Sequence, residues 1–268
     1  MPYAQAGELE IYYELHGQAS GDALVLLNGA LDTIESDWSK HLPAFAARGR
    51  VLAYDHRGHG RTSASPTPFS GYDLLVGDLV ALLDALGITR AHFCGFSDGA
   101  ITLLYFARQH PERVHSLILA GAQYTNDERS LALLAKMTPE RIPVRLPEWA
   151  ARLAALHDTH HEPGYWQQLM RQMQLLWPVQ PDLALEQLAE IAAPTLLIAG
   201  ERDGFGHIDQ QVSMRRAIRH AELCILPAAG HDVLNDQPEL FQLAALGFLS
   251  RNDLGLAQRG LGKVQPSP

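Results

Sequence analysis

The stretch that decides the fold is Arg90-Ala91-His92-Phe93-Cys94-Gly95-Phe96-Ser97-Asp98-Gly99-Ala100-Ile101-Thr102-Leu103-Leu104-Tyr105-Phe106-Ala107. Apolar residues lead up to Gly95, and beyond Gly99 they recur at helical spacing, which predicts a strand that passes through a tight turn into a helix. Glycines two before and two after Ser97 are expected where the strand and helix backbones approach so closely that a Cβ would clash. The turn is therefore the pattern of a nucleophile elbow, with Ser97 strained and exposed at a helix N-terminus.

Length and composition limit the class of protein. The 268 residues, 47% of them hydrophobic, suffice for one α/β core with an elaboration. The formal net charge of −9 argues against nucleic acid or an anionic membrane as the main partner, because a protein that follows phosphates needs a basic stripe.

The cysteines and the hydropathy pattern bear on the compartment. Cys94 and Cys224 each fall in an expected buried strand, so we interpret them as core residues in a reducing compartment, without a disulfide. The first 20 residues lack a basic region followed by an apolar run, and no run of about 18 uncharged apolar residues occurs. We expect the cytoplasm as the localisation.

Strands and helices alternate along most of the chain. The alternating pattern of Glu8–Leu15 predicts a half-buried strand near a sheet edge. Uninterrupted apolar runs predict strands covered on both faces at Ala23–Leu27, Val51–Tyr54, Val114–Ala120, Thr195–Ala199 and Glu222–Leu226. Helical spacing predicts helices near Trp38–Ala47, Tyr72–Leu86, Gln210–Arg219 and Pro238–Leu249. The fold class is α/β, with a mostly parallel sheet flanked by helices.

The pattern changes between Gln123 and about Ile191. This segment has no strand-like run, and its apolar residues are interrupted by prolines, which predicts short, broken helices. An insertion between two strands of such a sheet would sit over the carboxyl ends of the strands, where ligands bind, and is interpreted as a lid. The expected division is a core of residues 1–122 and 192–251, a lid of 123–191 and a mobile tail of 252–268.

The loop Asp55–Ser63 is charged and rich in glycine, a composition that could indicate a metal or phosphate site. Its histidines do not have the i, i+4 spacing of a helical zinc pair, and no third ligand is evident. We predict a structural loop in which Asp55 pairs with Arg57. The histidines of the lid are expected to lie on a solvated helix face rather than to bind metal; they are His157, His160 and His161.

A serine nucleophile needs a base to take its proton and a carboxylate to orient that base. Asp203 follows the strand Thr195–Ala199, and His231 follows the strand Glu222–Leu226, each at the strand's carboxyl end. Both side chains can therefore meet Ser97 above the sheet. The order Ser97, Asp203, His231 is the one expected for a nucleophile elbow of this kind.

Alternatives exist for the acid, and the oxyanion donors must come from two backbone segments. Glu201 lies before the turn and Asp209 on the following helix, so Asp203 is preferred. The expected oxyanion hole consists of the backbone N–H groups of Asp98 and Ala30. Asn28 is either an ordinary turn residue or part of a loop whose backbone faces inward.

These motifs resemble those of the α/β-hydrolase superfamily from about Glu8 to Leu249. Leu27-Asn28-Gly29-Ala30 stands where relatives commonly have His-Gly; the other matching stretches are Tyr54–Gly60, which resembles a D-x-R-G-x-G loop, Gly95–Ala100, Gly200–Asp203 and Gly230-His231. The resemblance implies an eight-stranded, mostly parallel sheet, a helical cap, and hydrolysis with no metal and no cofactor. Asn28 departs from the usual His. Ser97 in place of Asp argues against the haloalkane dehalogenase and epoxide hydrolase branches.

The expected activity is hydrolysis of a carboxylic ester or lactone of a small, partly apolar compound through an acyl-enzyme. Ser97 attacks the carbonyl, His231 moves the proton, and Asp203 orients His231. A substrate pocket is predicted from Asn28 and from lid residues that could equally form the core of the lid: Trp149, Trp166, Met170, Met173 and Trp177. The expected partner is a small-molecule substrate, with no nucleic acid and no membrane. The oligomeric state stays open.

Two alternatives use the same triad, namely cleavage of a carbon–carbon bond in a vinylogous diketone and perhydrolysis. A third, from another class, is a non-catalytic ligand receptor, against which the three filled triad positions argue. Asp98 also has two interpretations. A carboxylate in the first turn of a helix is favoured by the helix dipole. Alternatively Asp98 reads a positive charge on the substrate, since the Ser-Asp-Gly elbow resembles that of valacyclovirase-like hydrolases, which accept amino-acid esters.

Overall fold

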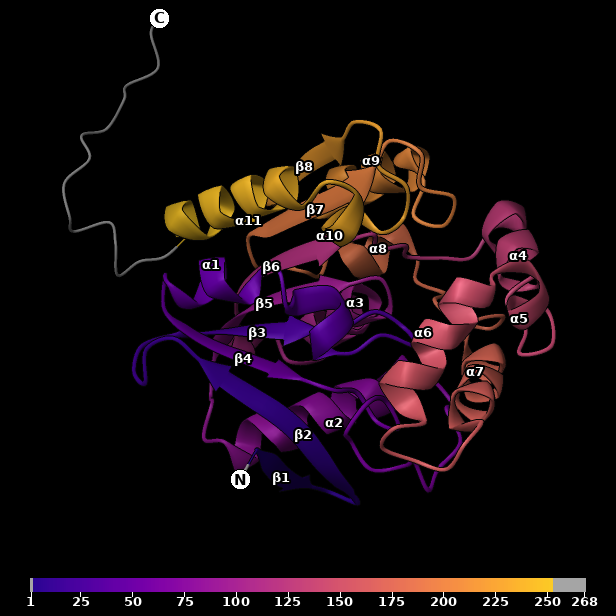
Figure 1. Ribbon diagram of the computed structural model, residues 1–268. Coiled ribbons are helices and arrows are strands. Elements are labelled where there is room, and N and C mark those ends of the chain that lie inside the picture. Colours follow the sequence, from indigo (N-terminus) through magenta and orange to yellow (C-terminus); the bar gives the residue numbers. More distant parts are fainter. Residues whose placement is uncertain (1, 253–268) are drawn as a thin grey trace, which may run out of the picture.

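The computed structural model describes residues 2–252, and its centre is an eight-stranded sheet (Figure 1). The strands are β1 (Tyr3–Ala6), β2 (Leu9–His16), β3 (Ala23–Leu27), β4 (Arg50–Tyr54), β5 (Ala91–Phe96), β6 (Val114–Ala120), β7 (Thr195–Gly200) and β8 (Ala221–Leu226). Their order is β1-β2-β4-β3-β5-β6-β7-β8. β2 is antiparallel to β1 and β4, and the other neighbours pair in parallel, so the predicted mostly parallel sheet is confirmed.

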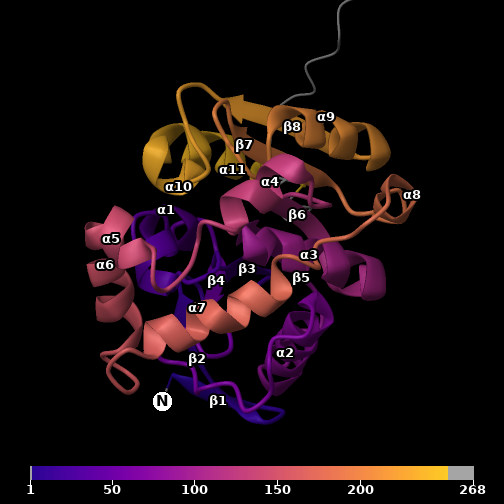
Figure 2. The same ribbon diagram turned by 90° about the vertical axis from the view of Figure 1, so that its right-hand side faces the viewer.

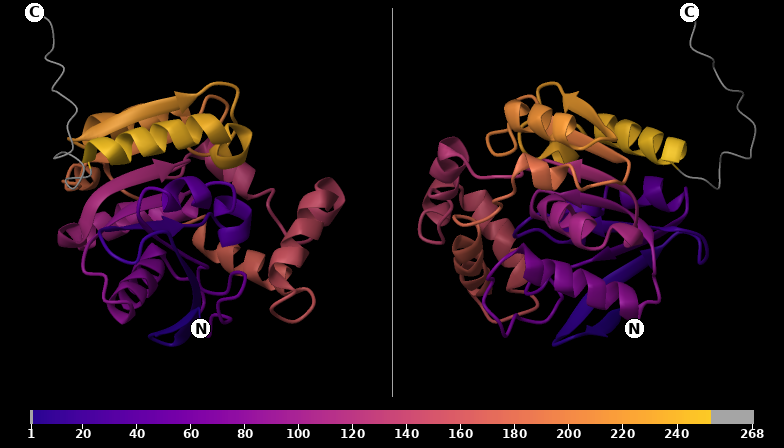
Figure 3. Two further views of the ribbon diagram at one scale, coloured as in Figure 1. Left: turned by 60° about the vertical axis from the view of Figure 1, so that its left-hand side comes forward. Right: turned by 180° about the vertical axis from the view of Figure 1, so that it is seen from behind.

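Helices cover both faces of the sheet, each over its own apolar cluster. One face carries α1 (Leu42–Ala46), α10 (Val233–Asp236) and α11 (Pro238–Asn252); the other carries α2 (Tyr72–Ala85), α3 (Asp98–Gln109) and α9 (Ile208–Ala217). The second set lies in front of the sheet when the molecule is seen from behind (Figure 3, right). Two short turns complete the core, π-helical at Ile34–Trp38 and 3₁₀ at Pro111–Arg113. The tail expected to be mobile lies outside the described residues, except for Asn252, which ends α11.

Five helices lie between β6 and β7 in the segment 123–191, which we call the insertion. They are α4 (Glu128–Leu134), α5 (Ile142–Arg145), α6 (Pro147–His157), α7 (Tyr165–Leu176) and α8 (Leu185–Leu188). α4 to α7 stand beside the carboxyl ends of the parallel strands, and Figure 2 views them from the front. The buried residues Leu153, Leu169 and Met173 belong to the same apolar cluster as α2 and α3. The insertion therefore shares its hydrophobic contacts with the core.

The last strand differs from the sequence expectation. β8 was predicted to be covered on both faces, but Glu222 is exposed and the three residues after it are only partly buried. The reason is that β8 ends the sheet and pairs with β7 alone. Cys94 in β5 is buried, Cys224 in β8 is partly exposed, and both are free. Among residues 2–252, no helix is long and apolar enough to cross a membrane.

The prediction that Asp55 pairs with Arg57 was wrong. The Arg57 guanidinium instead reaches Asp78 on α2, with Nε and Nη2 each 2.6 Å from a carboxylate oxygen. Asp55 accepts hydrogen bonds from the backbone N–H groups of Ile34 and Arg61. Arg57 is buried, and a planar guanidinium out of water is stabilised best by a bidentate carboxylate. The Arg57 side chain thus ties this loop to α2, while Asp55 bonds to the backbone of Ile34 and Arg61.

Candidate active site

The turn between β5 and α3 places Ser97 in the strained backbone that the sequence predicted. Ser97 has φ 49° and ψ −118°, in the left-handed region that non-glycine residues rarely adopt. A Cβ on Gly95 would lie 2.6 Å from the carbonyl of Gly99. One on Gly99 would lie 2.5 Å from the carbonyl oxygens of Leu27 and Asn28. The two glycines are required because β5, α3 and the end of β3 meet here backbone to backbone.

The structure brings Ser97, His231 and Asp203 together. His231 Nε2 lies 2.9 Å from Ser97 Oγ, and His231 Nδ1 lies 3.0 and 2.9 Å from the two Asp203 oxygens. Ser97 follows β5, Asp203 follows β7, and His231 follows β8, so three carboxyl ends of parallel strands supply the three side chains. Glu201, the alternative carboxylate, instead accepts a hydrogen bond from the N–H of Ala228. This geometry suits proton transfer from a hydroxyl to an imidazole.

The electrostatics of this chain favour a cationic His231. Partial burial lowers the pKa of His231, but the facing Asp203 carboxylate raises it more, and the net pKa lies above the ordinary 6.5. Burial raises the pKa of Asp203, but His231 and the backbone N–H of Phe205 lower it further, so that the net pKa lies below 3.8. The Asp203 side chain has no exposed surface, whereas a quarter of the His231 side chain remains exposed. Asp203 is thus held as an anion against the imidazole.

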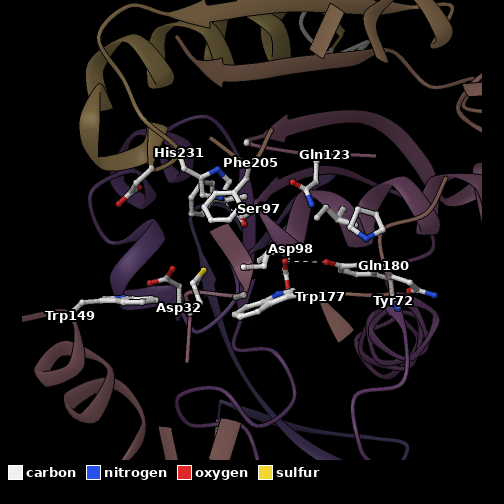
Figure 4. Close-up of a pocket in the computed structure, with 18 of the residues that line it drawn as sticks. Asp32, Tyr72, Ser97, Asp98, Gln123, Trp149, Trp177, Gln180, Phe205 and His231 are labelled. Carbon is white, nitrogen blue, oxygen red and sulfur yellow. Dashed lines mark hydrogen bonds between the residues drawn. The ribbon is translucent and has the colours of Figure 1, made fainter. Parts of the chain in front are cut away.

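A cavity of about 280 Å³ opens over Ser97 (Figure 4). Ala30 and Asp98, whose backbone N–H groups were expected to form the oxyanion hole, line it next to Ser97 and His231. Asn28 does not line this cavity. It is fully buried, and its Nδ2 donates to the carbonyl of Tyr54, 3.0 Å away, which ties the end of β3 to β4.

The insertion forms part of the cavity wall, but only two of the five side chains that were predicted to line the cavity do so. Trp149 and Trp177 line the cavity, whereas Trp166, Met170 and Met173 do not, and they pack in the apolar cluster. Sequence reasoning missed several lining residues, since nothing in their local pattern marks them: Asp32, Tyr72, Gln123, Leu134, Met137, Arg152, Gln180 and Phe205. The wall is therefore mixed, with aromatic, amide and charged side chains.

Asp98 has partners that neither interpretation of the sequence included. Tyr72 Oη donates to one carboxylate oxygen and Trp177 Nε1 to the other, each at 3.1 Å. Burial raises the pKa of Asp98 to about 6, although these two donors lower it. Two neutral donors, one from α2 and one following α7, thus bond directly to the buried carboxylate (Figure 4). Asp98 also links the insertion to the core.

A second acidic group flanks the cavity. Arg152 on α6 places Nη2 3.0 Å from Asp32 Oδ1, and Asp232 lines the same side. Burial raises the pKa of Asp32 to about 6, although Arg152 and Ser36 lower it. The neighbouring Asp37 accepts the N–H of Gly29 at 2.8 Å, which anchors the loop that contains Ala30. Carboxylates outnumber cations around this cavity.

The expectation of a solvated helix face was wrong for one histidine of the insertion. His157, the last residue of α6, is fully buried, and its Nε2 lies 3.0 Å from the carbonyl oxygen of Leu31. His160 is exposed as expected, and His161 is partly buried against the ring of Tyr165. Helical periodicity could not identify His157, because its partners come from the loops after β3 and β4.

Comparison with known proteins agrees with the fold. The family model described as "alpha/beta hydrolase fold" matches residues 22–238. The chain is 30% identical over 275 residues to a protein named "Putative carbamate hydrolase RutD" from Azorhizobium caulinodans, covering 94% of this chain and 100% of that protein. It is 30% identical over 268 residues to "3-oxoadipate enol-lactonase 2" from Acinetobacter baylyi, covering 92% and 95%.

A solved structure gives the same result. The enol-lactonase from Burkholderia xenovorans LB400 superimposes with a TM-score of 0.76 at 25% sequence identity, covering 93% of this chain and 100% of that one. The family model spans well over half of the chain, and it includes the elbow, Asp203 and His231. The chain therefore belongs to the α/β-hydrolase family and is a hydrolase.

Proposed function

We propose that this hydrolase cleaves a carboxylic ester or lactone of a small, partly apolar substrate through an acyl-enzyme on Ser97. The observation that carries the proposal is the continuous hydrogen-bonded series from Ser97 Oγ through His231 to Asp203, with every distance between 2.9 and 3.0 Å. A nucleophile bonded to a base, which is itself oriented by a carboxylate, is the arrangement that acyl transfer requires.

The chemistry follows from the positions of these groups. His231 accepts the Ser97 proton while Oγ attacks the carbonyl carbon, and the backbone N–H groups of Ala30 and Asp98 stabilise the oxyanion. His231 then donates that proton to the leaving alkoxide as the tetrahedral intermediate collapses to the acyl-enzyme. Water, activated by His231 in the same way, releases the acid and regenerates Ser97. Asp203 stays ionised and stabilises the imidazolium that forms twice in each cycle.

The cavity and the relatives support the substrate class. A volume of about 280 Å³ with Trp149 and Trp177 in its wall suits a small compound with an apolar part. The lactone and the carbamate in the names of these relatives share the electrophilic carbonyl that Ser97 would attack. The insertion acts as a lid in this proposal, since Trp149, Arg152 and Trp177 all come from it.

A substrate panel combined with active-site labelling tests the proposal. Ser97→Ala and His231→Ala should each abolish most turnover of 4-nitrophenyl esters and lactones. The double variant should lose little more than either single variant, because triad members act as a unit. A fluorophosphonate should label the wild type and not Ser97→Ala. Turnover of a ring-fission diketone but not of esters would favour carbon–carbon cleavage, and absence of labelling would favour a receptor.

A further inference from the structure

We propose that His157 of the insertion, together with His59 of the loop after β4, is a positioning residue that holds the oxyanion loop in its catalytic conformation. The inference rests on the proposed function, since it concerns the Ala30 N–H as an oxyanion donor. It starts from one residue, Leu31, whose two backbone polar groups are each bonded to a histidine: N–H to His59 Nε2 and C=O to His157 Nε2, both at 3.0 Å.

The loop after β3 is a tight turn that aims the Ala30 N–H. The Asp32 N–H donates to the Gly29 carbonyl, 3.3 Å away, which closes the turn Gly29-Ala30-Leu31-Asp32. In a trans peptide the carbonyl and the N–H point in opposite directions. The Gly29 carbonyl faces into the turn, so the Ala30 N–H of the same peptide faces out of it. Ala30 lines the cavity together with Ser97.

This turn needs external support because Leu31 is strained. Leu31 has φ 61°, at the third position of a turn where glycine or asparagine is the usual residue. A non-glycine residue stays in this region only when its surroundings hold it there. The two histidine bonds hold the peptide groups before and after Leu31. Together they fix the φ and ψ of Leu31, and the orientation of the Ala30 N–H in the turn depends on these angles.

Both ring nitrogens of each histidine form hydrogen bonds with backbone groups. His59 Nδ1 lies 2.8 Å from the Arg57 carbonyl, so His59 donates there and accepts from Leu31. His157 Nδ1 accepts the Gly60 N–H at 3.0 Å and donates from Nε2 to Leu31. Each ring must keep one nitrogen unprotonated, and burial correspondingly lowers the pKa of His157 to about 4 and that of His59 well below 6.5.

The consequence is that the insertion contributes to catalysis by way of the backbone of the oxyanion loop. His157 ends α6, the helix that also carries Trp149 and Arg152 into the cavity wall. A shift of α6 away from the core would release the Leu31 carbonyl before it changed any contact of Ser97 with His231. His157 touches no reacting atom, so its effect should appear in stabilisation of the oxyanion and not in binding.

Two substitutions at position 157 separate the two ring nitrogens. In His157→Gln the side-chain amide reaches the place of Nε2 and can still donate to Leu31. In His157→Asn it reaches only the place of Nδ1, keeping an acceptor for Gly60 and losing Leu31. We expect His157→Asn to lower kcat for 4-nitrophenyl butyrate by about 10- to 100-fold with little change in KM, since a displaced donor costs less than the 10²–10³-fold of a deleted one. His157→Gln should stay within about threefold of the wild type.

A thiono ester provides the readout that a structural role would not change. An oxyanion hole discriminates between oxygen and sulfur at the carbonyl, so the ratio of kcat/KM for the oxo ester to that for its thiono analogue should fall in His157→Asn and not in His157→Gln. His160→Asn, at an exposed position three residues on, is the matched control and should behave as the wild type. Should His157→Asn fail to fold, His59→Asn, which keeps a donor for Arg57 and loses the acceptor for Leu31, tests the same turn from its other side.

The outcomes separate this inference from the proposed function. If Ser97→Ala is inactive while the oxo-to-thiono ratio is unchanged in His157→Asn and His59→Asn, the positioning role is wrong and the triad stands. Equal losses in His157→Asn and His157→Gln would also overturn it, because only the first removes the Leu31 bond. If Ser97→Ala retains turnover, the proposed function itself fails.

Discussion

Replacing Asp98 by Asn should stabilise the protein at neutral and alkaline pH. Asp98 is buried next to the nucleophile, with one carboxylate oxygen facing Tyr72 Oη and the other facing Trp177 Nε1. An asparagine fits the same site, since its Oδ1 can accept from Trp177 while its Nδ2 donates to the Tyr72 hydroxyl, which is also an acceptor. The substitution therefore mimics the neutral carboxylic acid and removes only the charge.

The magnitude follows from the pKa of Asp98. Burial raises it from 3.8 to about 6, so the folded state disfavours the carboxylate relative to the unfolded chain. A difference of about two pKa units corresponds to about 3 kcal/mol of unfolding free energy. For a raised pKa this penalty is absent below pH 3.8, grows as the pH rises, and is complete above about 6. We expect Asp98→Asn to gain about 2–3 kcal/mol at pH 8 and nothing at pH 4.

Urea unfolding of wild type and variant at pH 8, 6 and 4 measures this difference. Asp73→Asn is the matched control, because Asp73 is exposed on α2 and an asparagine can still accept its hydrogen bond from Gln109 Nε2. The control should shift stability by less than about 0.5 kcal/mol at every pH. A lower unfolding free energy for Asp98→Asn than for the wild type at pH 8 would refute the reasoning, since the charge would then be stabilising.

Three further predictions concern the same site. The kcat/KM of the wild type should fall as the pH drops, because a protonated His231 cannot accept a proton. The midpoint should lie above 6.5, because the pKa of His231 is raised. A rate independent of pH between 5 and 8 would exclude His231 as the base. If Asp98 reads substrate charge, Asp98→Asn should lower kcat/KM for an α-amino ester by about 2 kcal/mol or more and spare its deaminated analogue; equal changes would leave Asp98 a structural role. Gly99→Ala should lose about 1–3 kcal/mol or more of stability in thermal melts, because its Cβ would lie 2.5 Å from two carbonyl oxygens. Gly77→Ala in α2 is the control: its Cβ would have no atom within 4 Å, so this variant should gain about 0.5–1 kcal/mol.

The parts of the site that the sequence predicted are those encoded by local pattern. Ser97, Asp203 and His231 each follow a strand whose apolar run ends in a glycine-containing turn, and in a parallel sheet such ends meet at one edge. The order of the three residues along the chain then assigns the roles of nucleophile, acid and base, although the distances between their side chains are not known from the sequence. The elbow glycines were predictable for the same reason, since the clash of their Cβ atoms comes from the strand-to-helix turn itself.

The parts that could not be predicted depend on contacts between distant segments. The partners of Asp98 are 26 and 79 residues away in sequence, and His157 is 126 residues from Leu31. Arg57 bonds to Asp78 rather than to Asp55, because the packing of α2 on the sheet puts a carboxylate within reach. The periodicity of apolar residues along the sequence carries no information about such contacts. The assignment of Trp166 to the cavity failed likewise, since an aromatic residue on an amphipathic helix looks the same whether it faces a ligand or a core.

The conformation of Ser97 makes the active protein less stable than an inactive one with the same fold. At φ 49° a serine occupies backbone that glycine would adopt with less strain, and such strain is of the order of 1–3 kcal/mol per residue. This is a sizeable share of the ~5–15 kcal/mol that keeps an ordinary domain folded. Random mutation selected for thermal tolerance alone should therefore tend to erase the nucleophile, and stabilising this enzyme calls for changes remote from the elbow, combined with a screen for turnover.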